Sequence, residues 1–295
     1  MDEREREAAV RKIAREGDPD RSIAALFAPR ETRAHLFALY ALNVELARIG
    51  EQVSEPQLGE IRLQWWRDAL DRAAAGESTG HPVADALGQA MRQCALPPEA
   101  IAGLIDARRF DMSAKIMPDT NALDAYLDNT AGALFRLASE VTEHGDRTKP
   151  RGATEPSALE PSVLEPAARA AGIAYGLTGL MRALPVHAAR GRIDLPADAL
   201  LRHGVTQAQL LAGKTSDGLT DLLAELRRQA RGALDQALDH LATLPPGARG
   251  AFLPLALVAP YLAALETGDP LRRVAEINPL YRLWRFGTYR FCRSV

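Results

Sequence analysis

Apolar residues recur at three- and four-residue steps through nearly every segment of this chain, and this period limits the fold more than any other feature. The stretch ALYALNVELARIGEQVSE, from Ala38 to Glu55, is typical, because Leu39, Leu42 and Leu46 fall on one helical face. No segment alternates apolar and polar residues convincingly, as a half-buried strand does. The sequence therefore predicts an all-α protein.

Proline and glycine divide this pattern into separate helices, since proline fits a first helical turn and glycine often follows a last one. The expected helices cover about 2–16, 22–27, 29–52, 56–76, 81–94, 98–113, 119–141, 164–184, 217–241 and 248–266, with short helices near Ala199 and Gln207. One flexible connector, rich in proline and charge, is expected at 143–162. Because the helices on its two sides depend on each other for burial, we expect a single domain over residues 1–295.

Composition bounds the class of protein. The 295 residues are 47% hydrophobic and 25% charged, with a formal net charge of -2. A general nucleic-acid-binding protein is usually strongly basic, so no nucleic-acid partner is expected. The only cysteines are Cys94 and Cys292, which excludes a disulfide framework or a thiolate metal cluster and fits a reducing compartment. The apolar run 251–265 is too short to span a bilayer and contains two prolines, which favours a buried core helix.

The start of the chain, MDEREREAAVRKIARE, lacks the apolar segment of a secretory signal and is too acidic for a transit peptide. Together with the richness in alanine and arginine, this start predicts a bacterial cytoplasmic protein that works at the cytoplasmic face of the inner membrane.

Short motifs assign no chemistry to the chain. Histidines stand at positions 35, 81, 144, 187, 203 and 240, and no two of them have metal-ligand spacing. No phosphate-binding glycine loop, Ser/His/Asp order or HExxH pattern occurs. The motifs therefore predict no metal site.

Longer segments are more informative. FAPRETRAHLFALYAL, YLDNTAGALFRLASE and AAGIAYGLTGLMRALPVHAARGRIDLPADAL resemble the squalene/phytoene synthase family, and the likeness covers almost the whole chain. In active members these segments hold a helix ending in an Asp-rich motif, a helix entering an Ala-Gly turn, and a second acidic motif. The resemblance implies a single-domain, all-α isoprenoid (prenyl) synthase fold, with helices around a central apolar pocket and the two motifs facing each other across it.

Both acidic motifs depart from the family pattern. In active members, opposed carboxylates hold Mg²⁺ ions that neutralise the charge of the departing diphosphate. In this chain the acidic places of the first motif fall on Ala47, Arg48 and Glu51. Those of the second motif fall on Ala183, Val186 and His187. Only Glu51 is acidic, so we expect no cofactor, with Mg²⁺ needed only if the chain is an enzyme after all.

The remaining family positions imply a vestigial pocket. Its expected residues are Tyr40, Ala47, Arg48 and Glu51 from the first motif region, and Arg182, Ala183 and His187 from the second. Arg48 is expected to pair with Glu51 at the pocket mouth, because residues three apart share a helix face. Arg48 and Arg182 have two open interpretations, an anionic head-group site or structural ion pairs.

A second resemblance narrows the function. ALNVELARIGEQVSE followed by IRLQWWRDALD is similar to a divergent branch of the same family, the mitochondrial complex I assembly factors related to phytoene synthases and their bacterial relatives. The residues that carry the likeness are Asn43 to Ala47, Ser54-Glu55, Arg62, Gln64, Trp65 and Trp66. The likeness implies a non-catalytic, peripheral membrane protein whose partners are complex I subunits or assembly intermediates.

Two surface features have both a functional and a structural interpretation. Trp65 and Trp66 are adjacent and cannot both point inward, so we expect one buried ring and one half-exposed ring, which is either incidental or part of a docking face. The C-terminal RLWRFGTYRFCRSV interleaves arginines with aromatics and includes Trp284, Arg285 and Arg290. It suits an anionic membrane surface, or a last helix that packs its rings on the core and leaves its arginines in solvent.

The sequence thus favours a pseudoenzyme that acts in respiratory complex I assembly. One alternative is a head-to-head prenyl-diphosphate synthase of squalene/phytoene type with atypical metal binding. Another is a lipid- or isoprenoid-binding module that uses the former pocket.

Overall fold

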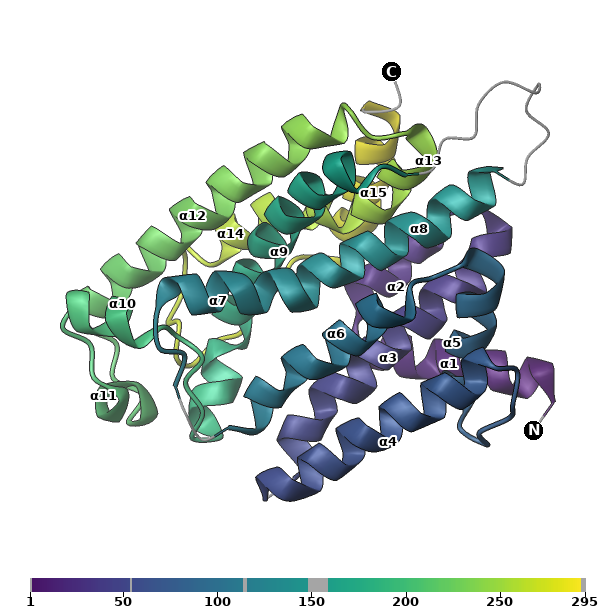
Figure 1. Cartoon of the computed structure of the whole chain (residues 1–295). Helices are drawn as coiled ribbons and strands as arrows, with labels where there is room; N and C mark the ends of the chain where they lie inside the picture. Colours follow the sequence, from purple (N-terminus) through teal and green to yellow (C-terminus); the bar gives the residue numbers. More distant parts are fainter. Residues whose placement is uncertain (1, 54, 114–115, 148–158, 293–295) are drawn as a thin grey trace. The chain divides into compact units, whose positions relative to one another are not determined.

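Helices form all the regular secondary structure in the computed structural model, which describes residues 2–53, 55–113, 116–147 and 159–292 (Figure 1). No strand occurs within those ranges, so the all-α prediction is confirmed.

The chain divides into two compact units, and each unit combines three separate stretches of sequence. Unit 1 consists of Met1–Ser113, Ala133–Glu165 and Thr243–Leu253. Unit 2 consists of Ala114–Gly132, Pro166–Ala242 and Pro254–Val295. The expectation of a single domain stays a prediction, as does the central pocket.

Unit 1 is built on α3 (Arg33–Gln52), because residues 36–42 of this helix are each at most 2% exposed. A helix that is apolar on all sides must be enclosed by other elements. Helices α1 (Glu3–Gly17), α5 (Pro82–Cys94) and α8 (Ala133–Arg147) pack against α3, as does the 3₁₀ helix η2 (Arg108–Met112). The other elements are α2 (Pro19–Ala25), η1 (Arg30–Thr32), α4 (Pro56–Ala74), α6 (Pro98–Ala107), α13 (Pro246–Arg249) and the start of η4 (Gly250–Leu257).

Helix starts in unit 1 follow the sequence signals. Helices α2, α4, α5, α6 and α13 carry proline in the first turn, where its missing N–H is not needed, at Pro19, Pro56, Pro82, Pro98 and Pro246. Helix α1 begins with a reciprocal cap between Asp2 and Glu5. One start differs from expectation, because residues 30–32 form a separate 3₁₀ turn and α3 begins at Arg33 rather than at Pro29.

Helices α4 and α5 approach each other closely at Gly88. A Cβ atom at this position would lie 2.6 Å from the carbonyl oxygen of Ala73, so a side chain would force the two backbones apart. The Arg92 guanidinium, one turn further along α5, donates to the same carbonyl. The α4–α5 pair therefore has a backbone-level contact that only glycine permits.

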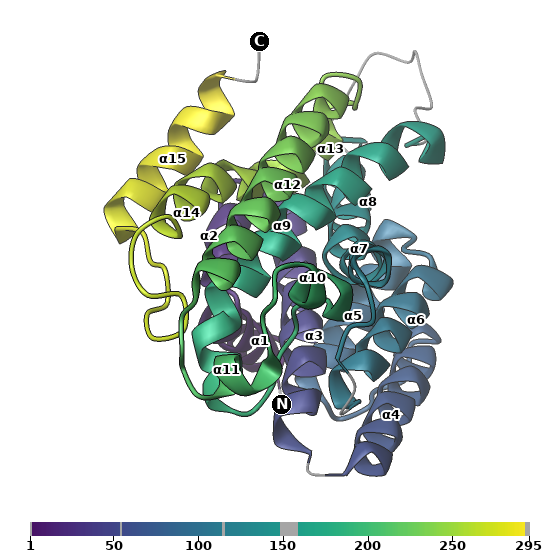
Figure 2. The same cartoon turned by 90° about the vertical axis from the view of Figure 1, so that its left-hand side faces the viewer.

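Unit 2 contains α7 (Thr120–Leu127), most of α9 (Pro161–Ala189), α10 (Ala197–Arg202), α11 (Gln207–Leu211), α12 (Asp217–Leu241), α14 (Val258–Ala264) and α15 (Pro279–Cys292). Helix α12 packs against α10 and α14, and Figure 2 shows α15 beside α14. Helix α7 continues into a π-helix, η3 (Asp128–Gly132). A Cβ at Gly172 of α9 would lie 2.5 Å from the Gly132 nitrogen, so glycine allows α9 to meet the end of this π-helix.

The connector between α8 and α9 is shorter than the expected 143–162. Helix α8 continues to Arg147, and α9 begins at Pro161. The extension of α8 is held by packing, since a Cβ at Gly145 would overlap the Thr32 side chain of η1. Residues 148–158 lie outside the described part of the chain.

The stretch Pro246–Ala264 is long and apolar enough to cross a membrane by length and composition alone. In the structure it is divided into α13, η4 and α14, and residues 251–258 are all buried. The expectation of a buried core segment is confirmed for these residues. Its form differs from expectation, because much of the stretch is 3₁₀ rather than α-helical.

The α4–α5 approach gives a stability test. Gly88→Val should lower the free energy of unfolding by about 1–3 kcal/mol or more, because its side chain has no room beside the Ala73 backbone. Gly103→Ala in α6 is the matched control, since a Cβ there meets nothing within 4 Å. The control should be neutral or stabilising, by up to about 1 kcal/mol. Urea unfolding followed by circular dichroism measures both, and equal stability of Gly88→Val and wild type would contradict the packing.

Candidate functional site

The first-motif residues lie on one side of α3, where the helix leaves the core. Spacings of seven and eleven residues bring Tyr40, Ala47 and Glu51 onto one face. Tyr40 is buried, and burial raises the pKa of its hydroxyl. Ala47 and Arg48 are half-buried, while Glu51 is exposed. The helix thus groups the expected residues, but only Tyr40 among them is enclosed.

Arg48 pairs with Glu45 rather than with Glu51, which corrects the expected pair. Its Nη1 atom lies 3.4 Å from Glu45 Oε1. Both acids stand three residues from Arg48, but an acid on the N-terminal side of a base is the more favourable order in a helix. Glu45 is also half-buried, so its attraction is screened less than that of an exposed acid. The positive charge of Arg48 is therefore balanced by Glu45, which is closer than Glu51 to the buried half of α3.

Asn43 joins α3 to η2. Its Oδ1 accepts a hydrogen bond of 2.6 Å from Arg108 Nη2, and Arg108 Nη1 lies 3.1 Å from Asp111 Oδ2. Two turns further along the same face of α3, a Cβ at Gly50 would lie 2.8 Å from the Asp111 carbonyl oxygen. Asp111 is 8% exposed, so this network is largely enclosed. Asn43 was identified only by resemblance, and the sequence pattern gave no sign that Arg108 and Asp111 would be its neighbours.

The two adjacent tryptophans have different environments, as expected. Trp66 is 4% exposed and Trp65 is 39% exposed. The two indole ring centroids lie 5.1 Å apart. The His81 ring centroid lies 5.4 Å from that of Trp65 and 5.0 Å from that of Trp66. Burial lowers the pKa of His81, although Glu45 and Asp85 act in the opposite direction. This neutral ring therefore packs as an aromatic partner that fastens α4 to the start of α5.

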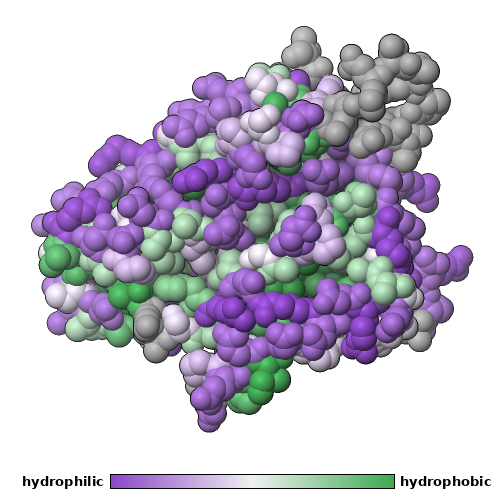
Figure 3. Space-filling view, viewed as in Figure 1, coloured by the Kyte–Doolittle hydropathy of each residue, from purple (hydrophilic) through white to green (hydrophobic). Residues whose placement is uncertain are grey.

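The outer side of α4 carries an apolar stripe. Leu58, Ile61 and Trp65 are 48%, 65% and 39% exposed, and their three- and four-residue spacings align them. We call these three residues the α4 stripe. Figure 3 shows a hydrophobic spot over the first turns of α4, at the lower edge of the view. Arg62, beside the stripe, donates to Gln52 Oε1 at 2.9 Å and so links α4 to the end of α3.

His187 stands at one of the second-motif positions, and its side chain contacts an acid, Asp194. Its Nδ1 atom contacts Asp194 Oδ2, and Arg192 Nε donates to Asp194 Oδ1 at 2.6 Å. Burial acts to raise the pKa of Asp194, but the bonds from His187 and Arg192 outweigh it and hold the pKa below its usual value. The nearest acid to this motif position is therefore held in an internal network. Sequence analysis named His187 and missed Asp194, which follows it after a tight turn.

Arg182 makes structural contacts within unit 2. Its guanidinium lies 3.6 Å from the ring centroid of Tyr261, and its Nε donates to the Ala275 carbonyl at 3.2 Å. The Tyr261 hydroxyl in turn accepts a 3.1 Å hydrogen bond from Arg282. Of the two interpretations of Arg182, these contacts with a ring and a carbonyl favour the structural one.

Small residues occupy the same face of α9, at Gly176, Gly179 and Ala183. Ala183 is half-buried. A Cβ at Gly176 would lie 2.6 Å from Leu127 Cδ2. The leucine therefore takes the space that a larger residue at position 176 would need. A Cβ at Gly179 would meet nothing within 4 Å.

The C-terminal residues are arranged the opposite way from the structural expectation. Trp284 is 57% exposed, whereas Arg285 is half-buried and donates to the Ala256 carbonyl at 3.2 Å. Only Phe286 among the described rings of this helix is fully enclosed. The Arg290 side chain lies outside the described part of the structure.

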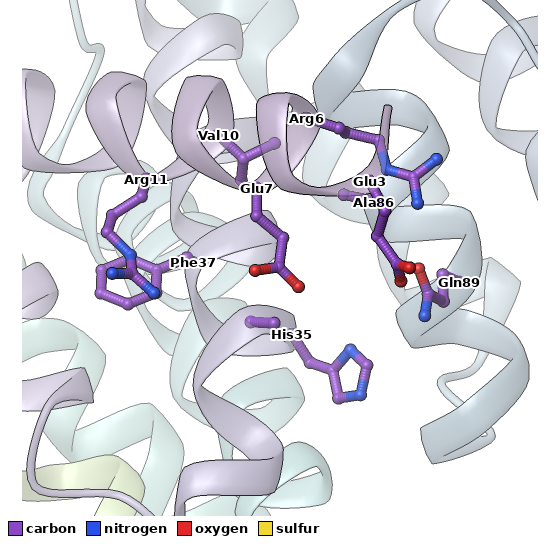
Figure 4. A pocket seen from close by; sticks show the side chains of 10 residues that line it. Glu3, Arg6, Glu7, Val10, Arg11, His35, Phe37, Ala86 and Gln89 are labelled. Atoms are coloured by element: carbon purple, nitrogen blue, oxygen red, sulfur yellow. The ribbon is translucent and has the colours of Figure 1, made fainter. Parts of the chain in front are cut away.

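One hollow on unit 1 was not foreseen (Figure 4). Residues of α1, α3 and α5 line it, namely Glu3, Arg6, Glu7, Val10, Arg11, Ala34, His35, Phe37, Ala86 and Gln89. Both signs of charge surround it, and Arg11 lies 5.2 Å from the Phe37 ring centroid. It opens at the start of α3, about 18 Å along the helix from the first-motif positions at 1.5 Å per residue. No expected site residue lines it.

The described residues of each unit offer little for metal chemistry. In neither unit do three His, Cys, Asp or Glu side chains of the described chain gather as a metal-binding group. The first-motif positions belong to unit 1 and the second-motif positions to unit 2. Within each unit the charged groups at these positions are engaged with protein atoms, Arg48 with Glu45 and His187 with Asp194.

Comparison with known proteins identifies relatives with two different names. The chain is 29% identical over 258 residues to "NADH dehydrogenase (ubiquinone) complex I, assembly factor 6" of Bos taurus, which covers 88% of this chain and 73% of the relative. It is also 29% identical over 217 residues to a phytoene synthase of Arthrospira platensis, covering 72% of this chain and 69% of the relative. Its likeness thus extends both to assembly factors and to active-type synthases.

A solved structure has the same fold. The squalene synthase HpnC from Alicyclobacillus acidocaldarius superposes with a TM-score of 0.73 at 24% identity, covering 88% of this chain and 93% of that one. This confirms the expected isoprenoid synthase fold.

The expected location in a bacterial cytoplasm is wrong. The assembly factors that resemble this chain come from cattle, human, mouse and rat, all of them eukaryotes. The expectation rested on the first residues and on a richness in alanine and arginine, and neither feature identifies a source or a compartment.

The family assignment rests on a match that includes both motif regions. The family model for squalene/phytoene synthases matches residues 14–280, which include positions 47 to 51 and 183 to 187. The chain belongs to the squalene/phytoene synthase family.

Proposed function

We propose that this protein acts in the assembly of respiratory complex I and does not transfer prenyl groups. The observation that carries the proposal is the basic residue at the first motif, Arg48, paired with Glu45 where the family's chemistry needs free carboxylates. The similarity to complex I assembly factors, one of which covers 88% of this chain, supports an assembly role over prenyl transfer.

The charge at the first motif works against prenyl transfer. A departing diphosphate carries several negative charges, and family enzymes neutralise them with Mg²⁺ held by opposed carboxylates. The Arg48 guanidinium lies 3.4 Å from half-buried Glu45 and already neutralises it. The same positive charge repels a metal ion. Glu51 alone would remain as a ligand from this motif, and one carboxylate does not hold a cluster of Mg²⁺ ions.

The second motif region supports the same proposal. Asp194 is shared between His187 and Arg192, so a metal ion would have to displace both partners to use it. Arg182 is stacked on Tyr261 and bonded to a backbone carbonyl. We therefore propose that the protein needs no metal cofactor and that the former motifs now stabilise the fold.

The assembly role requires a protein surface, and the α4 stripe is the best candidate for it. The stripe lies in the segment that resembles the assembly-factor branch, and Trp65 is its aromatic residue. Exposed aromatic residues in an apolar surround are frequent energetic centres of protein interfaces. The proposed partners are subunits or assembly intermediates of complex I.

The catalytic part of the proposal is tested with purified protein, Mg²⁺ and farnesyl or geranylgeranyl diphosphate. Release of pyrophosphate should not exceed the background without protein, because Glu51 is the only acid among the three first-motif positions. An active phytoene synthase assayed in parallel shows that the conditions support the reaction. The variant Ala47→Asp/Arg48→Asp should stay inactive, since the second motif remains without its acids. Magnesium-dependent product formation by the wild-type chain would establish the enzyme alternative.

The assembly part is tested by deleting the gene in the source organism. Assembled NADH:quinone oxidoreductase in the membrane should fall clearly, while squalene and carotenoid levels stay unchanged. Native gel electrophoresis with an activity stain measures the first quantity, and lipid chromatography measures the second.

Complementation of the deletion with variant genes distinguishes a role of the α4 stripe from a role of the first-motif positions. The Ala47→Asp/Arg48→Asp gene should restore complex I, whereas Trp65→Ala should restore it poorly at equal protein level. Trp65 is chosen over Trp66 because Trp66 is buried and its loss would disturb folding. Loss of an isoprenoid product with intact NADH oxidation in the deletion strain would refute the assembly role.

A further inference from the structure

Helix α15 is attached to unit 2 through its basic side. Arg282 donates to the Tyr261 hydroxyl at 3.1 Å, and Arg285 donates to the Ala256 carbonyl at 3.2 Å. Phe286, one turn after Arg282 on the same side of the helix, is fully buried. Arg282 and Arg285 therefore face the protein, where hydroxyl and carbonyl oxygens accept hydrogen bonds from their N–H groups.

The opposite side of α15 is apolar and exposed. Leu280, Tyr281, Leu283 and Trp284 are 76%, 42%, 47% and 57% exposed. At 100° per residue these four positions span about 160° of the helix, on the side away from Arg282 and Phe286. The rings of Tyr281 and Trp284 are stacked with centroids 5.4 Å apart. We call these four residues the α15 outer face.

This arrangement reverses the usual polarity of a surface helix. A helix on a water-soluble core normally turns its apolar residues inward and its charged residues outward. Here two arginines are half-buried while two leucines, a tyrosine and a tryptophan face outward. A contiguous exposed apolar patch of this kind marks a contact site rather than chance exposure.

Charge is also segregated at this end of the chain. Residues 269–295 contain six arginines, two acids and no lysine, a local net charge of +4. The whole chain carries -2, so the first 268 residues carry -6. Arg272 and Arg273, just before α15, are exposed. A strongly positive end on an acidic chain is complementary to an anionic surface.

From the reversed helix and its charge we infer that the α15 outer face docks on an anionic lipid bilayer. Leucine side chains enter the boundary between headgroups and acyl chains, and tyrosine and tryptophan favour this boundary because their rings are apolar and their tips polar. Arginines near the membrane attract the acidic headgroups. The inference is independent of the assembly role, since it rests on this face alone.

The size of the face argues against a second copy of the chain as its occupant. A stable protein interface buries about 800 Å² and some 20–30 residues per partner. The α15 outer face offers four side chains, so it is small for a dimer contact. A bilayer needs only a few inserted side chains when charge attraction contributes as well.

Vesicle flotation with the full chain tests the inference. The protein should bind vesicles of phosphatidylcholine with phosphatidylglycerol and bind phosphatidylcholine alone much more weakly. Raising the salt from about 0.1 M to 1 M shortens the Debye length from about 10 Å to 3 Å, so binding should weaken. Tryptophan emission should shift to the blue on binding, as Trp284 leaves water.

Paired variants identify the face. Leu280→Ser/Leu283→Ser should reduce binding to the anionic vesicles by about tenfold or more, because two inserted apolar side chains are lost. Leu58→Ser/Ile61→Ser on the α4 stripe is the matched control and should bind as wild type does, since both pairs are exposed leucine or isoleucine residues on one helix. Circular dichroism should show the same folded helix content for both variants.

Three results would overturn the inference. The first is no flotation of the wild-type chain with anionic vesicles. The second is equal flotation of the α15 variant and wild type. The third is a wild-type dimer by light scattering that becomes monomeric in the α15 variant, which would assign the face to self-association.

Discussion

Complete burial of the first half of α3 is the constraint on which unit 1 depends. Residues 36–42 have no side that water reaches, so other elements must enclose the helix on every side. Helices α1, α5 and α8 and the turn η2 do so, and they come from distant parts of the sequence. The motif positions can vary while this helix is kept, because the buried apolar half holds the unit together and positions 47, 48 and 51 lie in the more exposed half.

The sequence predicted the helical class and most helix starts because those depend on local signals. Pro56 and Pro82, for example, mark helix starts through their own geometry, without regard to the rest of the molecule. The π-helix at 128–132 and the 3₁₀ form of 250–257 were missed, because both depend on packing partners and have no distinct residue pattern.

Within the site, positions could be predicted and partners could not. Ala47, Arg48 and His187 came from resemblance, but the partner of Arg48 was assigned wrongly because two acids stand at equal sequence distance from it. Asp194 was missed because its link to His187 crosses a turn. The outward face of α15 could not be predicted either, since a helix with apolar residues on one side and arginines on the other normally packs the other way round.

The close α4–α5 crossing has a consequence for binding at the α4 stripe. Gly88 lets the two backbones meet, and Arg92 donates a hydrogen bond to the Ala73 carbonyl. The Trp66 and His81 rings pack together where α5 begins. These three contacts of different kinds leave the stripe little conformational freedom to lose. A partner that binds there meets a pre-organised surface, so the entropy lost on association comes mainly from the partner's own side chains and from its overall motion.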